Sequence, residues 1–408
     1  MAIKIILLLI CVVIIHAHTS DNHYHIIIDA GSTGSRLYLF QYILQHHYPI
    51  INVISTTKNY GGLSNVGSNN AGISLKQLLD NAQAEILRRN LNNITIDVLG
   101  TAGMRLLSST EQESIYNDIK SYIQEHYTFH IGRVMTISGE MEGIYGWLEI
   151  NYLRHTLISN HKIVKGFYDK LDVELDVGSN DELYVGLNDE LDVELPVGVV
   201  DVGGASVQIT FANNVVPNMY FNNILNDHAY HNLSYVVNHT DSLITKSLLG
   251  KGLRSTRLSM NKHHLAHTCY PSNDTNSFDF DVCKSLYINI LRDVKSLFSV
   301  GEQHFIVIGA AYTTYHFFDI LDGNDRQHVQ QHIKHICNEW KIDDHMIKKV
   351  YPYTSEIDYC ADAVYFDTLL YDVFGMQFDN ISIINSINGR DVNWVTGALF
   401  YEIASGNM

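Results

Sequence analysis

Basic residues are scarce in this chain of 408 residues, which has 27 Lys and Arg against 44 Asp and Glu and a formal net charge of −17 at pH 7. A protein that binds nucleic acid presents a basic surface to the phosphate backbone. The charge balance therefore argues against a nucleic-acid partner. With 46% hydrophobic residues, the composition is that of a globular protein, and the length allows two domains with a full core each.

Long apolar runs are also lacking beyond the N-terminus. Residues 5–15 follow Lys4 and precede Ala17, the pattern of a secretory signal with a basic start, an apolar core and a small residue at the cleavage site. We predict a signal peptide over residues 1–18, with an uncleaved anchor as the alternative, since a membrane-spanning helix needs about 20 apolar residues. No later segment is predicted to span a membrane, so we expect a secreted, periplasmic or lumenal protein.

Cysteine is rare, with five residues in the whole chain. Cys11 lies in the predicted signal, which leaves an even number in an exported chain and indicates two disulfides. Pairing by proximity along the sequence gives Cys269–Cys283 and Cys337–Cys360, with buried free thiols as the alternative. No pair has the close spacing of a zinc site.

Two stretches of the chain share one pattern, an apolar strand that ends in Asp, a turn of small residues and an alternating strand. The first runs from Asp29 to Arg36 and the second from Asp201 to Gln208. Glycines permit the sharp turn, its backbone N–H groups form an anion site, and the aspartate can hold a cation. One such turn is most often an ordinary hairpin. The pair indicates two hairpins that clamp a polyphosphate and its metal across a cleft.

Strands and helices are predicted to alternate along the chain, which indicates a mixed α/β architecture. We expect helices over residues 75–91, 111–126, 283–298 and 361–370, and strands over 94–99, 134–137 and 305–308. Residues 165–197 differ in kind, since they are acidic and contain the near-repeat LDVEL twice. A low-complexity insertion is favoured there over an acidic calcium-binding loop. The predicted lobes are residues 24–160 with 386–408, and 198–385.

Hydrolysis of a phosphoanhydride requires charge neutralisation, an in-line water and a base. Asp29 and Asp201, at strand ends, are natural holders of a divalent cation. For the base, the sequence offers Glu140 and Glu142 in a glycine-bracketed loop before a helix. A carboxylate there could accept a proton from water held by the second hairpin. The alternative is that both acids only stabilise the helix N-terminus.

These residues resemble the apyrase family, the ecto-nucleoside triphosphate diphosphohydrolases of the actin-like ATPase superfamily. Five motifs occur in the family's order: Asp29–Arg36, Gly100–Leu107, Ser138–Trp147 with Asn151–Leu153, Asp201–Gln208, and Trp394–Gly397. The resemblance covers nearly the whole mature chain apart from the acidic insertion. It implies two RNase H-like (actin-like ATPase) lobes with an active-site cleft between them, and nucleoside tri- and diphosphates as substrates.

The resemblance also implies roles for individual residues. Glu142 would activate the attacking water, positioned by Ser206 and Gln208, without a phosphoenzyme. Hydrated Ca²⁺ or Mg²⁺ would be surrounded, largely through water, by Asp29, Thr101, Asp201 and Trp394. Phosphates would contact the two turns at Ser32, Thr33, Gly34, Arg36, Gly203, Gly204 and Ala205. Tyr315 and Tyr365 fall where the family stacks aromatic rings on the nucleobase, with core aromatic residues as the alternative.

The predicted function is that of a secreted, monomeric, cation-dependent hydrolase that removes terminal phosphates from nucleoside tri- and diphosphates. An exopolyphosphatase or sugar kinase of the same superfamily is one alternative, although a kinase must exclude water. A non-catalytic nucleotide- or glycan-binding relative is another. Gly34 and Arg36 resemble the diphosphatase, Golgi-type and bacterial branches, which leaves the preference between tri- and diphosphates open.

Overall fold

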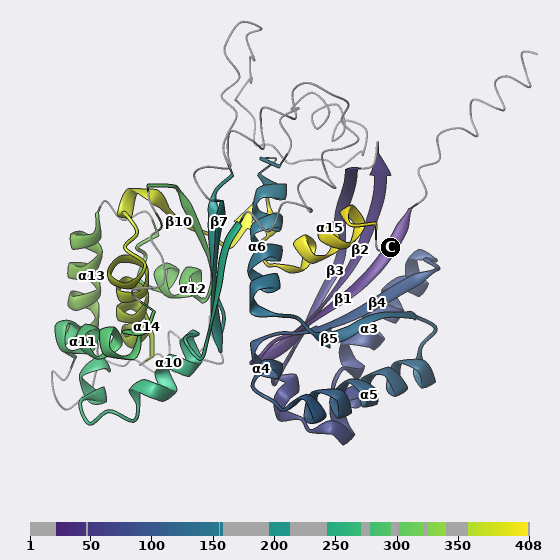
Figure 1. The fold of residues 1–408 in the computed structure, drawn as a ribbon, viewed down its shortest axis with the longest axis horizontal. Helices are drawn as coiled ribbons and strands as arrows, with labels where there is room; N and C mark the ends of the chain where they lie inside the picture. Colours follow the sequence, from purple (N-terminus) through teal and green to yellow (C-terminus); the bar gives the residue numbers. More distant parts are fainter. Residues whose placement is uncertain are drawn as a thin grey trace, which may run out of the picture. The chain divides into compact units, whose positions relative to one another are not determined.

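The computed structural model describes residues 22–45, 48–154, 156–157, 196–212, 243–270, 278–294, 300, 302–321, 325–339 and 358–406. The chain divides into two compact units, Met1–Ser138 with Leu399–Met408, and Gly139–Ala398 (Figure 1). The predicted signal over 1–18 and nearly all of the predicted insertion over 165–197 lie outside the described residues. The predicted lobes have other boundaries than these units and stay a prediction.

The first unit is built on a five-stranded sheet with the order β3-β2-β1-β4-β5. Strands β1 to β3 form an antiparallel meander, and β4 and β5 continue the sheet parallel to β1. The central strand is apolar, and Ile26, Ile27 and Ile28 are fully buried. The strands are β1 (His23–Ala30), β2 (Gly34–Gln45), β3 (Tyr48–Tyr60), β4 (Ile94–Gly100) and β5 (His130–Thr136).

Helices α3 (Lys76–Arg89) and α5 (Ser109–His126) bury their apolar residues in one core with this sheet. Helix α5 begins with a capping box, in which Ser108 accepts from the Glu111 N–H and the Glu111 carboxylate accepts from the Ser108 N–H. The remaining helical segments are short: η1 (Leu63–Asn65), η2 (Ser68–Asn70), α2 (Ala71–Ser74) and α4 (Ala102–Arg105).

The second unit repeats the sheet of the first. Its order is β10-β9-β6-β7-β8, with β6 to β8 as an antiparallel meander and with β9 and β10 parallel to β6. In each unit, three strands therefore form an antiparallel meander. Two further strands, parallel to the first strand of the meander, extend the sheet beside that strand. The strands are β6 (Gly198–Val202), β7 (Ser206–Ala212), β8 (Leu243–Leu249), β9 (Phe305–Gly309) and β10 (Ile381–Ile383).

Helices cover both faces of the second sheet. Helix α6 (Gly139–Leu153) packs against β6, β7 and β8 on one face, and the other large helices lie on the opposite face (Figure 1). The core on that face contains the π-helix η5 (Thr368–Val373). The other helices are α10 (Leu253–Met260), α11 (Phe280–Ile290), α12 (Ala310–Phe317), α13 (Arg326–Glu339) and α14 (Asp358–Asp367).

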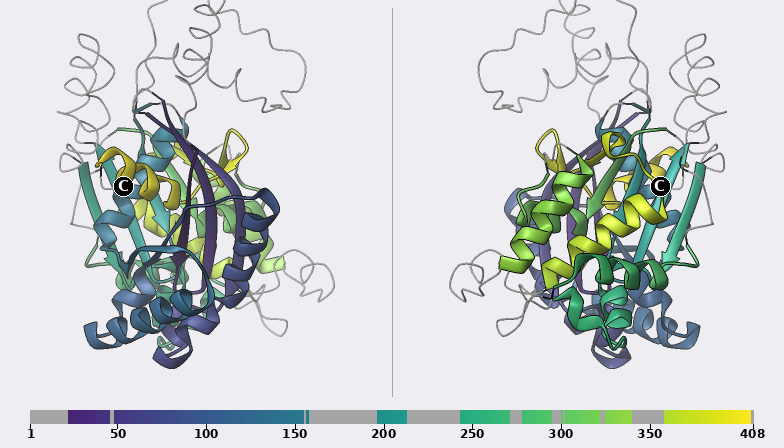
Figure 2. Two further views of the ribbon diagram at one scale, coloured as in Figure 1. Left: turned by 90° about the vertical axis from the view of Figure 1, so that its right-hand side faces the viewer. Right: turned by 90° about the vertical axis from the view of Figure 1, so that its left-hand side faces the viewer.

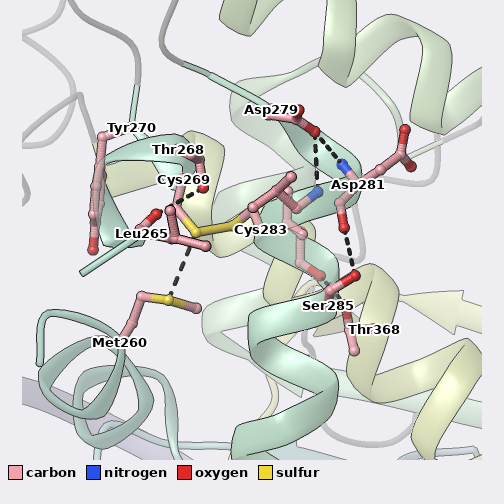
Figure 3. Close-up of a disulfide and its surroundings, with 12 residues drawn as sticks. Met260, Leu265, Thr268, Cys269, Tyr270, Asp279, Asp281, Cys283, Ser285 and Thr368 are labelled. Atoms are coloured by element: carbon pink, nitrogen blue, oxygen red, sulfur yellow. Dashed lines mark hydrogen bonds between the residues drawn. A yellow bond between two sulfur atoms is a disulfide. The ribbon is translucent and has the colours of Figure 1, made fainter. Parts of the chain in front are cut away.

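Two disulfides join elements of this core, and both predicted pairs are confirmed. Cys269, in η4 (Ala266–Cys269), pairs with Cys283 of α11, beside Met260 (Figure 3). Cys337 on α13 pairs with Cys360 on α14. The two helices are neighbours, as the right-hand view of Figure 2 shows. Each bridge closes a short loop of chain and restrains the unfolded state.

The last part of the chain holds η6 (Phe378–Asn380), a two-stranded sheet of β11 (Ser386–Ile387) and β12 (Arg390–Asp391), and helix α15 (Val395–Ala404). Within the described part of the chain, no helix is both long and apolar enough to cross a membrane.

Candidate active site

The two predicted hairpins have the same geometry. Gly31 N donates to Gly34 O over 3.0 Å, and Gly203 N donates to Ser206 O over 3.0 Å. In the strand pairing, Asp29 lies opposite Arg36, and Asp201 lies opposite Gln208. The repeated sequence pattern thus produces the same turn at the end of the central strand of each sheet.

The first unit brings Thr101 next to the Asp29 turn. Leu99 pairs with Asp29 across β1 and β4, and Thr101 N donates to Ala30 O over 3.3 Å. Asp29 is half-buried, and Thr101 is buried. Four predicted phosphate-binding residues follow in the turn and in the start of β2, half-buried or exposed: Ser32, Thr33, Gly34 and Arg36.

A neighbouring segment holds this first turn in place. Ser35 N donates to Asn59 Oδ1 over 3.0 Å, and Gly61 N donates to Thr33 O over 3.0 Å. At Gly62 a Cβ would lie 2.2 Å from Ser32 O, so only glycine allows the two backbones to approach. No role was predicted for this segment from the sequence, although its adjacent glycines could have indicated a close approach of two backbones.

Lys58, in the strand before this segment, was also not predicted from the sequence. It lies opposite Arg36 across β2 and β3, with its Nζ 5.0 Å from the centroid of the Tyr60 ring. Burial lowers the pKa of Lys58, and so does the positive charge of Arg36. Two cations side by side repel each other, which favours an anion as their partner. Only the pairing of β3 with β2 reveals this neighbour.

The second unit brings the three predicted catalytic residues together. Gln208 Nε2 donates to Glu142 Oε2 over 3.1 Å and to Ser206 Oγ over 2.7 Å. It also lies 3.2 Å from the hydroxyl of Ser247 on β8, a residue that the sequence analysis missed. Glu142 is only 7% exposed. Glu140, two residues earlier, is exposed. Of the two candidate bases, the buried one is therefore Glu142.

Gly143 explains how Glu142 reaches the sheet. A Cβ at this position would lie 2.6 Å from Thr210 Oγ1 and 2.9 Å from Thr245 Oγ1. Real Cβ atoms do not approach so closely, so the glycine lets the first turn of α6 lie directly on β7 and β8. The glycine that follows the glutamate therefore determines where the carboxylate sits.

The second turn is supported from one side by the segment after β8. Gly250 N donates to Ala205 O over 2.8 Å, and Leu253 N donates to Gly203 O over 3.0 Å. At Gly252 a Cβ would lie 2.5 Å from Ser206 N, so a glycine is again required for close backbone approach. Backbone groups of the segment after β8 therefore hold the predicted phosphate-binding residues of this turn in place.

Trp394 lies against helix α6. Its ring stacks on Tyr145, with centroids 6.3 Å apart and an interplanar angle of 21°, and it is buried. Helix α6 thus carries the predicted base Glu142 and contacts a second predicted site residue, Trp394.

The two tyrosines predicted to stack on a nucleobase are core residues. Tyr315 is 2% exposed and Tyr365 is 0% exposed, both within the second unit's hydrophobic core. The Tyr365 hydroxyl donates to Lys251 O over 2.6 Å, next to the segment that supports the second turn. This burial contradicts the nucleobase prediction, because a ring that stacks on a base must present an accessible face.

Each unit offers a carboxylate whose chemistry suits a hard divalent cation. Asp29 and Asp201 are half-buried carboxylates at strand ends, and carboxylate oxygens are the ligands that Ca²⁺ and Mg²⁺ prefer. Across the described ranges, no group of three or more His, Cys, Asp and Glu side chains is arranged to hold a metal ion directly.

The sequence matches the model of the GDA1/CD39 (nucleoside phosphatase) family over residues 15–270 and 282–408. The chain belongs to this family. It is 25% identical to "Probable apyrase 3" of Arabidopsis thaliana, over 94% of this chain and 83% of the relative. It is also 25% identical to "Ectonucleoside triphosphate diphosphohydrolase 8" of Gallus gallus, over 92% and 81%. The protein is thus a nucleotide phosphohydrolase that acts on phosphoanhydrides.

Solved structures support the fold. A nucleoside triphosphate hydrolase from Neospora caninum aligns over 100% of this chain and 97% of its own, with a TM-score of 0.64 and 14% identity. An exopolyphosphatase from Cytophaga hutchinsonii aligns over 94% and 98%, with a TM-score of 0.50 and 12% identity. The predicted α/β class with two actin-like ATPase sheets is confirmed.

Proposed function

We propose that this family member hydrolyses the terminal phosphate of nucleoside tri- and diphosphates by direct attack of water, in a secreted or lumenal compartment. The observation that carries the proposal is the hydrogen-bonded cluster of Glu142, Gln208 and Ser206. A carboxylate, an amide and a hydroxyl in contact are the groups needed to orient a water and take its proton.

Glu142 acts as the base in this proposal. Its carboxylate is nearly buried, so water in the site competes little with the one being activated. Gln208 donates to this carboxylate and to the Ser206 hydroxyl, which fixes both groups relative to each other. Ser206 and Gln208 then hold the attacking water, and its proton passes to Glu142.

The two turns bind the phosphates. Arg36, at the end of the first turn, supplies a charge-assisted contact, and Lys58 on the next strand adds a second positive charge. Backbone N–H groups of Gly203, Gly204 and Ala205 offer further donors. When bound, Ca²⁺ or Mg²⁺ neutralises charge on the phosphates, and Asp29 and Asp201, with Thr101 and Trp394 through water, would hold it.

The test is phosphate release from ATP, ADP and polyphosphate by the purified chain, with calcium or magnesium and then with EDTA. Release from ATP and ADP that EDTA abolishes supports the proposal. Release from polyphosphate alone would instead assign an exopolyphosphatase, and no release from any of the three would favour a non-catalytic relative.

The variant that tests the base is Glu142→Gln, which keeps the shape of the side chain and removes its basicity. We expect kcat for ATP to fall by roughly 10²- to 10⁴-fold while nucleotide binding persists. The matched control is Glu140→Gln, an exposed carboxylate in the same helical turn, which should leave kcat within about twofold of the wild type. Parallel loss of binding and turnover in Glu142→Gln would make Glu142 a structural residue.

A further inference from the structure

Glu149 is a fully buried carboxylate in the middle of helix α6, with 0% of its surface exposed. Its oxygens accept from three backbone N–H groups at the start of α15. The Oε1 atom accepts from Asn393 N over 3.2 Å, and Oε2 accepts from Thr396 N over 3.0 Å and from Gly397 N over 3.4 Å. Two helices far apart in the sequence are thus joined by one side chain.

Such an arrangement is costly unless the carboxylate is well bonded, because burial penalises a charged or polar group. Burial raises the pKa of Glu149 to about 8, and the backbone hydrogen bonds act in the opposite direction. In return, the first N–H groups of α15, which have no partner within their own helix, are satisfied. The positive end of the helix dipole also favours a carboxylate at this place.

The same segment packs tightly on α6. At Gly397 a Cβ would lie 1.9 Å from Tyr145 O and 2.9 Å from Glu149 N, so only glycine fits. Trp394, between the residues that Glu149 holds, stacks on Tyr145. Tyr145 therefore contacts the Trp394 ring, and Glu149 holds the backbone before and after Trp394.

Helix α6 also carries Glu142, seven residues before Glu149. Seven residues are about two helical turns, so the two side chains project from the same side of one rigid element. We propose that Glu149 is a positioning residue that holds Trp394 in register with the base Glu142 during nucleotide hydrolysis. This inference rests on the function proposed above and assigns no contact between Glu149 and the substrate.

The alternative is that Glu149 only stabilises the fold. A structural role predicts lower stability with normal turnover by the molecules that remain folded. A positioning role predicts a lower kcat in folded protein, with KM for ATP nearly unchanged, because substrate binding by the two turns is not altered. The comparison of kcat with KM therefore separates the two roles.

The experiment compares Glu149→Gln with the wild type and with Asp367→Asn. Asp367 is the matched control because it is another fully buried carboxylate of the second unit, bonded to Arg326 and Gln330. We expect Glu149→Gln to lower kcat for ATP by roughly 10- to 100-fold, since small misplacements of site residues have effects of this size. Asp367→Asn should lose thermal stability but keep kcat within about twofold.

Amide hydrogen exchange supplies a readout that does not need activity. In the wild type, the Thr396 and Gly397 amides should exchange as slowly as amides within α6, and Glu149→Gln should expose them while Asp367→Asn should not. Fast exchange in the folded wild type overturns the inference even if the variant does not fold. Equal kcat in wild type and Glu149→Gln also overturns it. A wild type without nucleotide hydrolysis would instead contradict the proposed function.

Discussion

The two units place different chemistry on the same backbone frame. In the first, a row across three neighbouring strands reads Asp29, Arg36, Lys58, and in the second the equivalent row reads Asp201, Gln208, Ser247. Both rows begin at an aspartate at the end of the central strand. One row continues with two cations, and the other continues with an amide and a hydroxyl.

Under the proposed function the two rows divide the work: the first would bind anions, and the second would orient water. Cations recognise phosphate oxygens. An amide and a hydroxyl beside a carboxylate can instead align a water without pairing with the carboxylate, so that it stays free to accept the proton. In the second unit, α6 brings Glu142 within hydrogen-bond distance of Gln208.

Conversion of the second row into the first should have the largest effect. We expect Gln208→Arg to lower kcat for ATP by at least roughly 10²-fold, because a cation would pair with Glu142 and reduce its basicity. The measurement is steady-state hydrolysis of ATP and ADP. Thr57→Val on β3, which lies outside both rows, serves as the control. If Gln208→Arg keeps more than a tenth of the wild-type kcat, the proposed role of this row is wrong.

A change in the first row should have a smaller effect. Lys58→Ser copies the residue of the second row. We expect KM for ATP to rise about three- to tenfold with little change in kcat, since the exposed Lys58 would attract the phosphates only through its charge. The effect should shrink at high salt. Lys76→Ser, another exposed lysine in the first unit, is the control. An unchanged KM at low salt would remove Lys58 from the phosphate site.

The smallest catalytic effect is expected away from both rows. Asp97 on β4 is buried beside His25 and bonded to Arg133 Nη2 over 2.6 Å. Burial alone would raise its pKa, but His25 and Arg133 outweigh burial and hold the pKa of Asp97 below its ordinary value of 3.8. The ionised Asp97 carboxylate therefore stabilises the folded state at pH values above 3.8, and this contribution is lost as the pH falls through the lowered pKa.

Asp97→Asn should therefore reduce the melting temperature at pH 7 while kcat stays within about twofold. The stability difference from the wild type should shrink as the pH falls below about 4. Thermal denaturation at several pH values measures it. A constant difference across this range would show that the charge of Asp97 is not what stabilises the first unit.

Patterns within short stretches of sequence predicted a large part of the site. The two Asp-to-turn motifs, both disulfides and the cluster of Glu142, Ser206 and Gln208 all follow from residues close in sequence or from the family resemblance. Lys58, Ser247 and Glu149 could not be found this way. Tyr315 and Tyr365 matched an aromatic pattern, but a pattern does not say which ring is buried.

The sequence by itself determined the hairpins, because glycine and aspartate at a strand end specify the turn locally. It also determined the α/β class, since apolar periodicity depends only on neighbouring residues. Only the tertiary structure decided which residues extend each row. A shift of one residue in the pairing of β3 or β8 would turn Lys58 or Ser247 to the other face of its sheet. The bond from Glu149 to α15 likewise exists only because glycine at position 397 lets the two helices touch.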